Sequence, residues 1–112
     1  MININPVRVA INGYGVIGKR VATAVLAQKD MRLAGVADIA TDWRLRVLEG
    51  QGIDLYAVTS EHAKAMREAG IPIAGTLDDL LGQADVVVDC APKRVAAQNA
   101  EIYRASGLKF IV

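Results

Sequence analysis

The sequence is poor in the residue types that staple small domains or bind metals. A single cysteine, Cys90, excludes an internal disulfide and is typical of a protein from a reducing cytoplasm. One histidine, His62, and that cysteine supply too few ligands for a zinc site, which needs three or four. Aromatic residues make up 4% of the chain, and no aromatic-rich stripe is present on which bases could stack. We therefore expect no metal and no disulfide framework.

Charge of one sign and long apolar runs are also missing. The 13 basic and 12 acidic residues leave a net charge of +1, and no basic tract favours nucleic acid as a partner. The longest apolar stretches have the length of a strand, far short of a membrane span. Residues 1–6 lack the basic start and apolar core of a signal peptide. We expect a cytoplasmic protein that binds neither membranes nor nucleic acid.

The residues that are present suit one folded domain. Hydrophobic residues make up 53% and charged residues 22% of a 112-residue chain, enough to bury a core. No linker divides the chain, so residues 1–112 form a single unit. The last apolar segment ends the chain on a strand pattern with nothing to cover it. We interpret the chain as a domain truncated before a catalytic domain.

Short runs rich in β-branched residues alternate with helical patterns along the chain. This alternation predicts a parallel sheet with helices on both faces, the doubly wound α/β architecture of Rossmann-like domains. The predicted strands are Val7–Ile11, Met31–Ala37, Leu55–Val58, Val86–Cys90 and Lys109–Val112.

The helical segments have recognisable faces and ends. Ser60 is a candidate cap for a helix that runs to Ala69, and Thr76 and Asp79 have the spacing of a capping box. Trp43 is interpreted as a packing residue of a short helix over residues 43–48. The predicted inward faces are Ile17, Val21, Ala24 and Val25 in the first helix, and Val95, Asn99, Ile102 and Tyr103 in the last.

Gly13, Gly15 and Gly18 form the pattern G-x-G-x-x-G between the first strand and the first helix. In this context the pattern predicts a dinucleotide site. Gly13 permits the tight turn, Gly15 admits a pyrophosphate, and Gly18 lets the helix pack on the sheet. The free N–H groups of Val16 and Ile17 would then face the phosphates. The alternative is an ordinary glycine-rich turn.

Asp38 ends the second strand at the expected distance from the glycines. A carboxylate there can accept hydrogen bonds from the adenosine ribose and repel a 2′-phosphate, which favours NAD, with NADP possible. The alternative is an aspartate that forms the turn before Ile39. The complete predicted cofactor site comprises Asn12, Gly13, Tyr14, Gly15, Val16, Ile17, Gly18, Asp38, Ala91 and Pro92.

Four other residues could take part in catalysis or ligand binding, but each also has an ordinary structural interpretation. Cys90 and His62 could form a catalytic pair, but a buried strand-end cysteine and a solvated histidine are the more ordinary interpretation. Lys93 and Arg94 follow Pro92, where they could touch adenine or phosphate or remain a solvated basic pair. We predict no catalytic residue within this chain.

Three blocks of the sequence resemble archaeal-type glyceraldehyde-3-phosphate dehydrogenases. They are VAINGYGVIGKRVA (Val9–Ala22), AGIPIAGT (Ala69–Thr76) and DVVVD (Asp85–Asp89), with family-like spacing between them. The first block is shared loosely with other dehydrogenases, and the second makes the resemblance specific. The resemblance covers essentially the whole chain, as the N-terminal NAD(P)-binding domain.

The resemblance implies a parent enzyme that oxidises glyceraldehyde 3-phosphate with NAD or NADP and phosphate in glycolysis or gluconeogenesis, usually as a homotetramer. Catalysis in that family passes through a cysteine thiohemiacetal, and the nucleophile lies beyond the segment matched here, so Cys90 does not inherit that role. The resemblance also assigns Val16 and Ile17 to cofactor binding.

Two segments depart from the family pattern. Asp38-Ile39-Ala40 replaces a Lys-Thr-Arg-like stretch suited to a 2′-phosphate, so NADP preference is not inherited. A family loop of small residues after Asp89 is replaced by Cys90–Ala96, which leaves the adenine contacts open. The alternatives are the cofactor domain of a homoserine dehydrogenase or dihydrodipicolinate reductase, a non-catalytic nucleotide sensor, or a minimal dinucleotide-binding domain.

Overall fold

A computed structural model describes residues 5–112, apart from the side chains of residues 43 and 44. The interpretation of Trp43 as a packing residue lies outside that description. The strands are β1 (Val7–Asn12), β2 (Met31–Asp38), β3 (Leu55–Ala57), β4 (Gly75–Thr76), β5 (Val86–Asp89) and β6 (Lys109–Ile111). The helices are α1 (Val16–Leu26), a 3₁₀ turn η1 (Trp43–Arg46), α2 (Val47–Gly50), α3 (Ser60–Glu68), α4 (Leu77–Leu81) and α5 (Lys93–Ala105).

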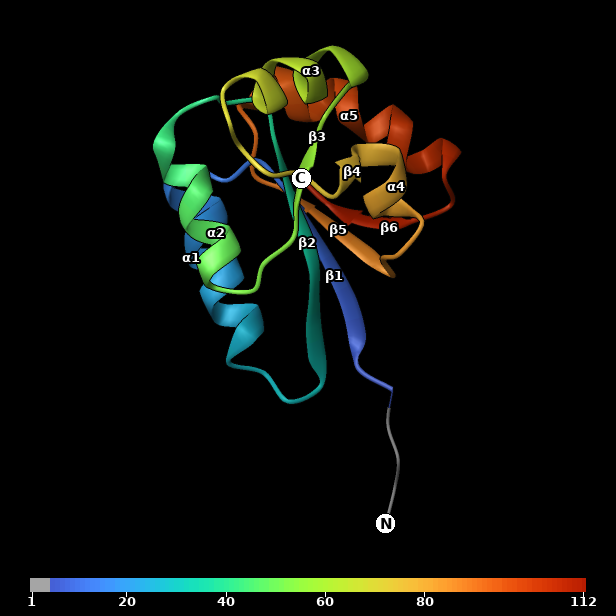
Figure 1. Ribbon diagram of the computed structural model, residues 1–112. Helices are drawn as coiled ribbons and strands as arrows, with labels where there is room; N and C mark the ends of the chain where they lie inside the picture. The colour runs from blue at the N-terminus through green and yellow to red at the C-terminus, as the bar shows by residue number, and fades with distance from the viewer. Residues whose placement is uncertain (1–4) are drawn as a thin grey trace.

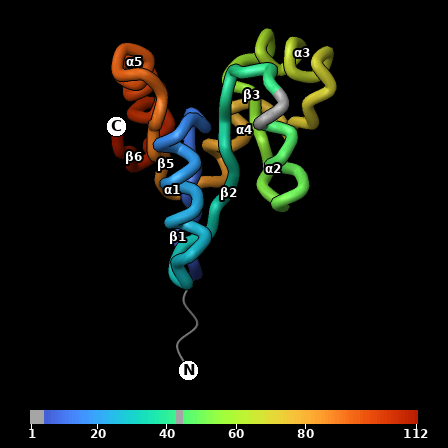
Figure 2. Tube along the Cα trace, turned by 90° about the vertical axis from the view of Figure 1, so that its left-hand side faces the viewer, coloured from blue at the N-terminus to red at the C-terminus, as the bar shows by residue number. Residues whose placement is uncertain are grey.

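The described strands form one sheet of six, and every neighbouring pair is parallel. Their order is β4-β3-β2-β1-β5-β6, so the chain winds outward from β1 in one direction and then in the other. Figure 2 shows the two halves, with β5, β6 and α5 on one side of β1 and β3, α2 and α3 on the other. The predicted doubly wound parallel sheet is confirmed, and its switch point lies between β1 and β5.

Successive residues of the central strands point into two separate cores. Ile11, Val36 and Leu55 pack with α1, α2 and α3 on one face, whereas Ala10 and Tyr56 pack with α4 and α5 on the other. In Figure 1, α1 and α2 lie together on one side of the sheet and α4 and α5 on the opposite side. Strands covered on both faces explain why their sequences are apolar runs without polar alternation.

The predicted inward face of α1 is wrong in part. Its buried residues are Gly18, Ala22 and Val25, with Val21 partly buried against the same core. Ile17 is 59% exposed, although Gly18 beside it is buried against the backbone of Gly13. Ala24 is also exposed, on the solvent side of the helix.

The inward face predicted for α5 is also half correct. Asn99 and Tyr103 are buried, but Val95 and Ile102 are each 42% exposed. The small residues Ala96 and Ala100 take the inward positions instead, since they allow the helix to approach the sheet closely.

Side-chain hydrogen bonds cap the N-terminal ends of α3 and α4. Thr76 and Asp79 form the predicted capping box, with the Thr76 N–H donating to Asp79 Oδ2 at 2.9 Å. The cap of α3 is Thr59 and not Ser60, because the Thr59 hydroxyl accepts the His62 N–H at 3.1 Å. Among the described residues, no helix is long and apolar enough to cross a membrane.

Candidate functional site

The loop between β1 and α1 lies at the switch point, and its path is shaped by Gly13 in the loop and Gly18 in the first turn of α1. Gly13 has φ of +100° and its backbone lies against the turn after β5, where an added Cβ would be 2.9 Å from the Ala91 nitrogen. A Cβ on Gly18 would lie 2.0 Å from the Gly13 carbonyl oxygen. Both positions exclude a side chain, so the loop and the helix that it starts are packed at backbone contact.

Gly15 differs from its two neighbours in the motif. Its φ is −87°, which any residue can adopt, and a Cβ there would meet no atom within 4 Å. It precedes α1 without a side-chain cap, so the first N–H groups of the helix have no partner from a capping side chain. Nothing within the described protein requires glycine here. Open space beside unpaired N–H groups at a helix start is what an approaching phosphate needs.

Asp38 lies at the end of β2 with its side chain 8% exposed. One carboxylate oxygen accepts the Tyr14 N–H of the glycine loop at 2.7 Å. The other accepts the Ile39 N–H at 2.6 Å and the Ala40 N–H at 2.9 Å. The predicted turn role of this residue is therefore present in the structure, and its contact with a ribose stays a prediction.

A second buried carboxylate, that of Asp89, ends β5. It accepts hydrogen bonds from the Tyr103 hydroxyl at 2.5 Å, the Asn99 amide at 2.9 Å and the Ala91 N–H at 2.9 Å. Tyr103 in turn accepts from the Asn12 amide at 2.9 Å. Burial, together with the Asp89 carboxylate, raises the pKa of Tyr103, so this phenol stays a proton donor. The network joins the ends of β1 and β5 to α5.

These elements surround a cavity of about 490 Å³ at the carboxyl ends of the strands. Seven predicted site residues line it: Asn12, Gly13, Tyr14, Gly15, Asp38, Ala91 and Pro92. Val16, Ile17 and Gly18 do not line it and lie in the first turn of α1. Its other lining residues were not predicted as site residues: Ile39, Val58, Cys90, Val95 and Asn99. Four of these follow strands or sit near helix starts, the positions that a switch point brings together.

The cavity holds little positive charge. No basic residue is among the described residues that line it, and Lys93 and Arg94 are exposed in the first turn of α5. Burial and the charge of Asp89 raise the pKa of the Cys90 thiol, the opposite of what a nucleophile needs. His62 Nδ1 lies 2.8 Å from the Thr59 hydroxyl, outside the cavity that contains Cys90. The structure does not bring the two residues together.

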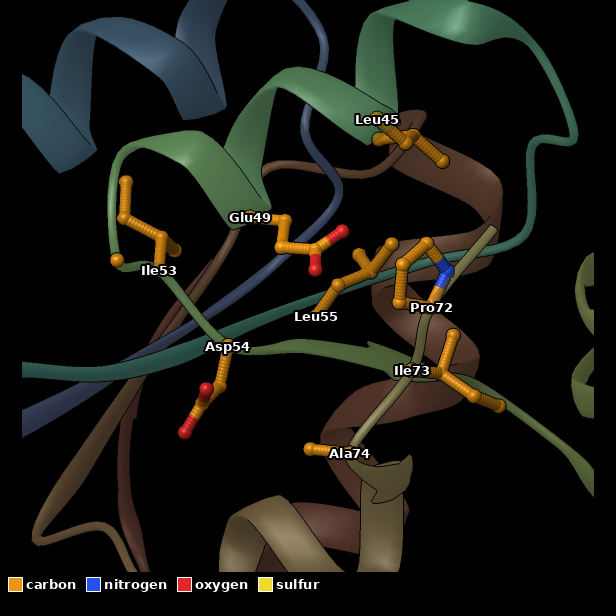
Figure 3. Close-up of a pocket in the computed structure, with 9 residues that line it drawn as sticks. Leu45, Glu49, Ile53, Asp54, Leu55, Pro72, Ile73 and Ala74 are labelled. Carbon is orange, nitrogen blue, oxygen red and sulfur yellow. The ribbon is translucent and has the colours of Figure 1, made fainter. Parts of the chain in front are cut away.

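A smaller cavity of about 300 Å³ lies elsewhere, between α2 and the segments that precede β3 and β4. Its walls are mainly apolar, from Leu45, Ile53, Leu55 and Pro72, and Glu49 also lines it (Figure 3). None of the predicted cofactor residues contributes to it. Over the described part of the chain, no group of three or more His, Cys, Asp or Glu side chains could hold a metal ion.

The fold and this site define a Rossmann-like NAD(P)-binding domain. The chain belongs to the family described as dihydrodipicolinate reductase, N-terminus, whose model matches residues 7–112. The residues present fit a dinucleotide, because Gly15 leaves room for a phosphate beside the start of α1.

The resemblance to archaeal glyceraldehyde-3-phosphate dehydrogenases is confirmed by curated relatives of that name. One from Methanothermobacter thermautotrophicus is 51% identical over 94% of this chain. Others are 46% identical over 92% of the chain (Methanothermus fervidus) and 48% identical over 90% (Metallosphaera sedula). The chain spans only 31%, 31% and 29% of the length of these three relatives.

Proposed function

We propose that this chain is the cofactor-binding domain of a phosphorylating glyceraldehyde-3-phosphate dehydrogenase that prefers NAD. The observation that carries the binding proposal is the open space at Gly15, at the start of α1 and beside the cavity at the switch point. The activity of the whole protein is proposed from relatives of that name at 46–51% identity. By the same resemblance we propose a cytoplasmic homotetramer that acts in glycolysis or gluconeogenesis.

The residues of this chain would bind and orient the cofactor, which supplies the hydride acceptor for the oxidation. The N–H groups of Gly15, Val16 and Ile17 would hold the pyrophosphate, supported by the positive end of the helix dipole. Ile39, Val95 and Pro92 contribute apolar surface to the lining of the cavity. The catalytic cysteine would come from the part of the relatives that this chain does not cover, so the chain alone would bind without turnover.

The preference for NAD over NADP follows from the charge around the cavity. Asp38 lines the cavity and is buried, and among the described residues that line it no basic side chain offsets a 2′-phosphate. Like charges about 4 Å apart repel by a few kcal/mol at an effective dielectric near 20, before salt screening. A net difference of one or two kcal/mol corresponds to roughly ten- to thirty-fold tighter binding of NAD.

Titration of the chain with both cofactors tests this preference. We expect Ile39→Arg to reduce the ratio of NAD affinity to NADP affinity. Ile39 lines the cavity and is 54% exposed, so a guanidinium at this position could contact a 2′-phosphate. The double variant Lys93→Ala, Arg94→Ala is the control and should leave the ratio unchanged. Equal affinities in the parent chain would contradict the proposed preference.

A second candidate activity is favoured by the family description itself. Dihydrodipicolinate reductases also bind a nicotinamide cofactor, and the N-terminal model of that family matches almost the whole chain. An assay of the full-length protein separates the two. We expect NAD reduction that requires both glyceraldehyde 3-phosphate and inorganic phosphate. Reduction of dihydrodipicolinate without that activity would support the alternative.

A further inference from the structure

The hydrogen bonds between β1 and β2 continue past the end of β1 into the glycine loop. The two strands pair as far as Asn12 and Ala37, and the Gly13 N–H then donates to the Ala37 carbonyl at 2.8 Å. The N–H of the following residue, Tyr14, would point away from β2 in a regular strand, but here it donates to Asp38 Oδ2 at 2.7 Å. The side chain of Asp38 therefore binds the main chain of the glycine loop at the point where the loop leaves the sheet.

Most of the accepting capacity of this carboxylate is already used. A carboxylate has about four lone-pair sites, and three are filled by the N–H groups of Tyr14, Ile39 and Ala40. Both donors from the following turn reach Oδ1, so the remaining site is on Oδ2. One free site leaves no room for two ribose hydroxyls that bind side by side.

The bond to Tyr14 connects a buried charge to the middle of the phosphate loop. Hydrogen bonds to ionised acceptors are roughly twice as strong as neutral ones, and this one is largely removed from water, with Asp38 only 8% exposed. It lies one residue from Gly15, whose position beside α1 determines where a phosphate can approach. A substitution of Asp38 would therefore alter phosphate binding by releasing the loop.

We infer that Asp38 is a positioning residue for the phosphate loop, and that its contact with the ribose is secondary. This inference rests on the proposed binding of a dinucleotide. It differs from the ribose-acceptor role expected of an acidic residue at this position, because loss of the carboxylate would weaken binding of the phosphates whether or not the ribose hydroxyls are present.

The test is a ligand cycle on the parent chain and on Asp38→Asn and Asp38→Ala, with ADP, 2′-deoxy-ADP and adenosine as probes. We expect both variants to bind ADP and 2′-deoxy-ADP roughly 10- to 100-fold more weakly, by the same factor for each. Affinity for adenosine, which has no phosphate, should not change. Asp30→Asn, an exposed carboxylate at the opposite end of β2, is the matched control and should bind like the parent.

Hydrogen exchange gives a readout that does not depend on a ligand. Exchange of the Tyr14 amide should accelerate in Asp38→Asn, which keeps the shape of the side chain, while the amides of Ala10 and Ile11 in β1 keep their protection. This outcome would show a released loop on an intact sheet even if Asp38→Ala failed to fold.

Two results would overturn the inference while leaving the proposed function in place. One is that the variants bind adenosine more weakly than the parent does, or lose affinity for ADP but bind 2′-deoxy-ADP as the parent does. Either would make Asp38 a ribose contact, the second through the 2′-hydroxyl. The other is that Tyr14 exchange is unchanged in Asp38→Asn. Failure of the parent chain to bind NAD or ADP at all would instead contradict the proposed function, and the inference with it.

Discussion

The glycines of the G-x-G-x-x-G motif serve different purposes, some for the fold and one for ligand binding. Substitutions can separate the two. Gly18 is fixed by contact with the backbone of Gly13, whereas Gly15 meets no protein atom. A side chain at Gly18 must therefore disturb the fold. A side chain at Gly15 should disturb only the ligand that binds there.

We predict that Gly15→Val folds as the parent does and binds NAD at least tenfold more weakly, since a branched side chain would occupy the phosphate approach. Gly18→Ala should lower the free energy of unfolding by about 1–3 kcal/mol through overpacking against backbone. Calorimetric titration and urea denaturation measure the two effects. Gly50→Ala is the control, because its Cβ would also meet open space, far from the cavity. Undiminished NAD binding by a folded Gly15→Val would mean that the site is misplaced.

Cys90 should react slowly with alkylating agents. Burial and the negative charge of Asp89 disfavour its thiolate, so its pKa lies above the ordinary value of 9.0. The thiolate fraction, and hence the iodoacetamide rate, should remain low at pH 8 and rise only above pH 9. The measurement is the rate against pH in the native chain, compared with glutathione. In urea the same thiol should react like a free cysteine. A fast native reaction near pH 7 would revive a nucleophilic role for this residue.

At the scale of elements, α5 is tied to the sheet by polar bonds as well as by packing. Asp89 ends β5, Asn12 ends β1, and both reach the hydroxyl of Tyr103 on α5. The ring of Tyr103 is completely buried, so the two partners of its hydroxyl are removed from bulk water. Loss of the hydroxyl would remove the hydrogen bond that the buried Asn12 amide donates, whereas Asp89 would keep the bonds from Asn99 and Ala91.

We predict that Tyr103→Phe lowers the free energy of unfolding by about 1–3 kcal/mol, the usual result of leaving buried polar groups without a partner. Urea denaturation with an unchanged slope would assign the loss to the native state. Tyr56→Phe is the matched control, since this tyrosine is also buried but its hydroxyl makes no hydrogen bond in the described part of the chain. An equal loss in both variants would show that the network contributes nothing of its own.

The sequence predicted the element order, because strand runs and glycine or proline boundaries are local signals. It placed β2 up to Ala37, and the structure extends this strand by one residue to Asp38. It missed β4, whose two residues carry no periodic pattern and pair only because β3 lies beside them. It also missed the register shift between β1 and β2. There Val9 pairs with Leu33, but the next residue, Ala10, pairs with Gly35, so Ala34 is skipped.

The helix faces were predicted less well, because apolarity alone does not decide burial at the ends of a helix. Ile17 and Val95 sit in the first turns of α1 and α5 and remain exposed there, whereas the smaller Gly18 and Ala96 of the same turns are buried. The sequence predicted seven of the residues that line the larger cavity, and their contacts with a dinucleotide stay a prediction. The network around Asp89 could not be predicted, because its members lie 10, 14 and 77 residues away in sequence and only the fold brings them together.

At the scale of the whole molecule, the crevice depends on the way the chain reverses at β1. Segments from the first and last parts of the sequence meet there, since the loop after β1 packs on the turn after β5. Both loops are held by hydrogen bonds to buried carboxylates of the chain itself. Loops held in this way lose little conformational freedom when a ligand binds, so most of the interaction energy should appear as affinity.

A ligand that binds this native crevice and not the unfolded chain must raise the unfolding temperature, and the size of the rise reports the affinity. At an NAD concentration of 100 times Kd the native state gains about 2.7 kcal/mol, which for a domain of this size corresponds to a rise on the order of 10 °C. We predict that rise for NAD, a smaller one for NADP at equal concentration, and a smaller one for NAD with Gly15→Val, because weaker binding lowers the ratio of NAD concentration to Kd. Differential scanning fluorimetry over a range of ligand concentrations measures all three. The rise must grow with the logarithm of NAD concentration above Kd, because the linkage is thermodynamic. A rise that saturates would mean that NAD also binds the unfolded chain. A rise that is undiminished in Gly15→Val would place the binding elsewhere on the molecule, since the loop around Gly15 would then have no part in it.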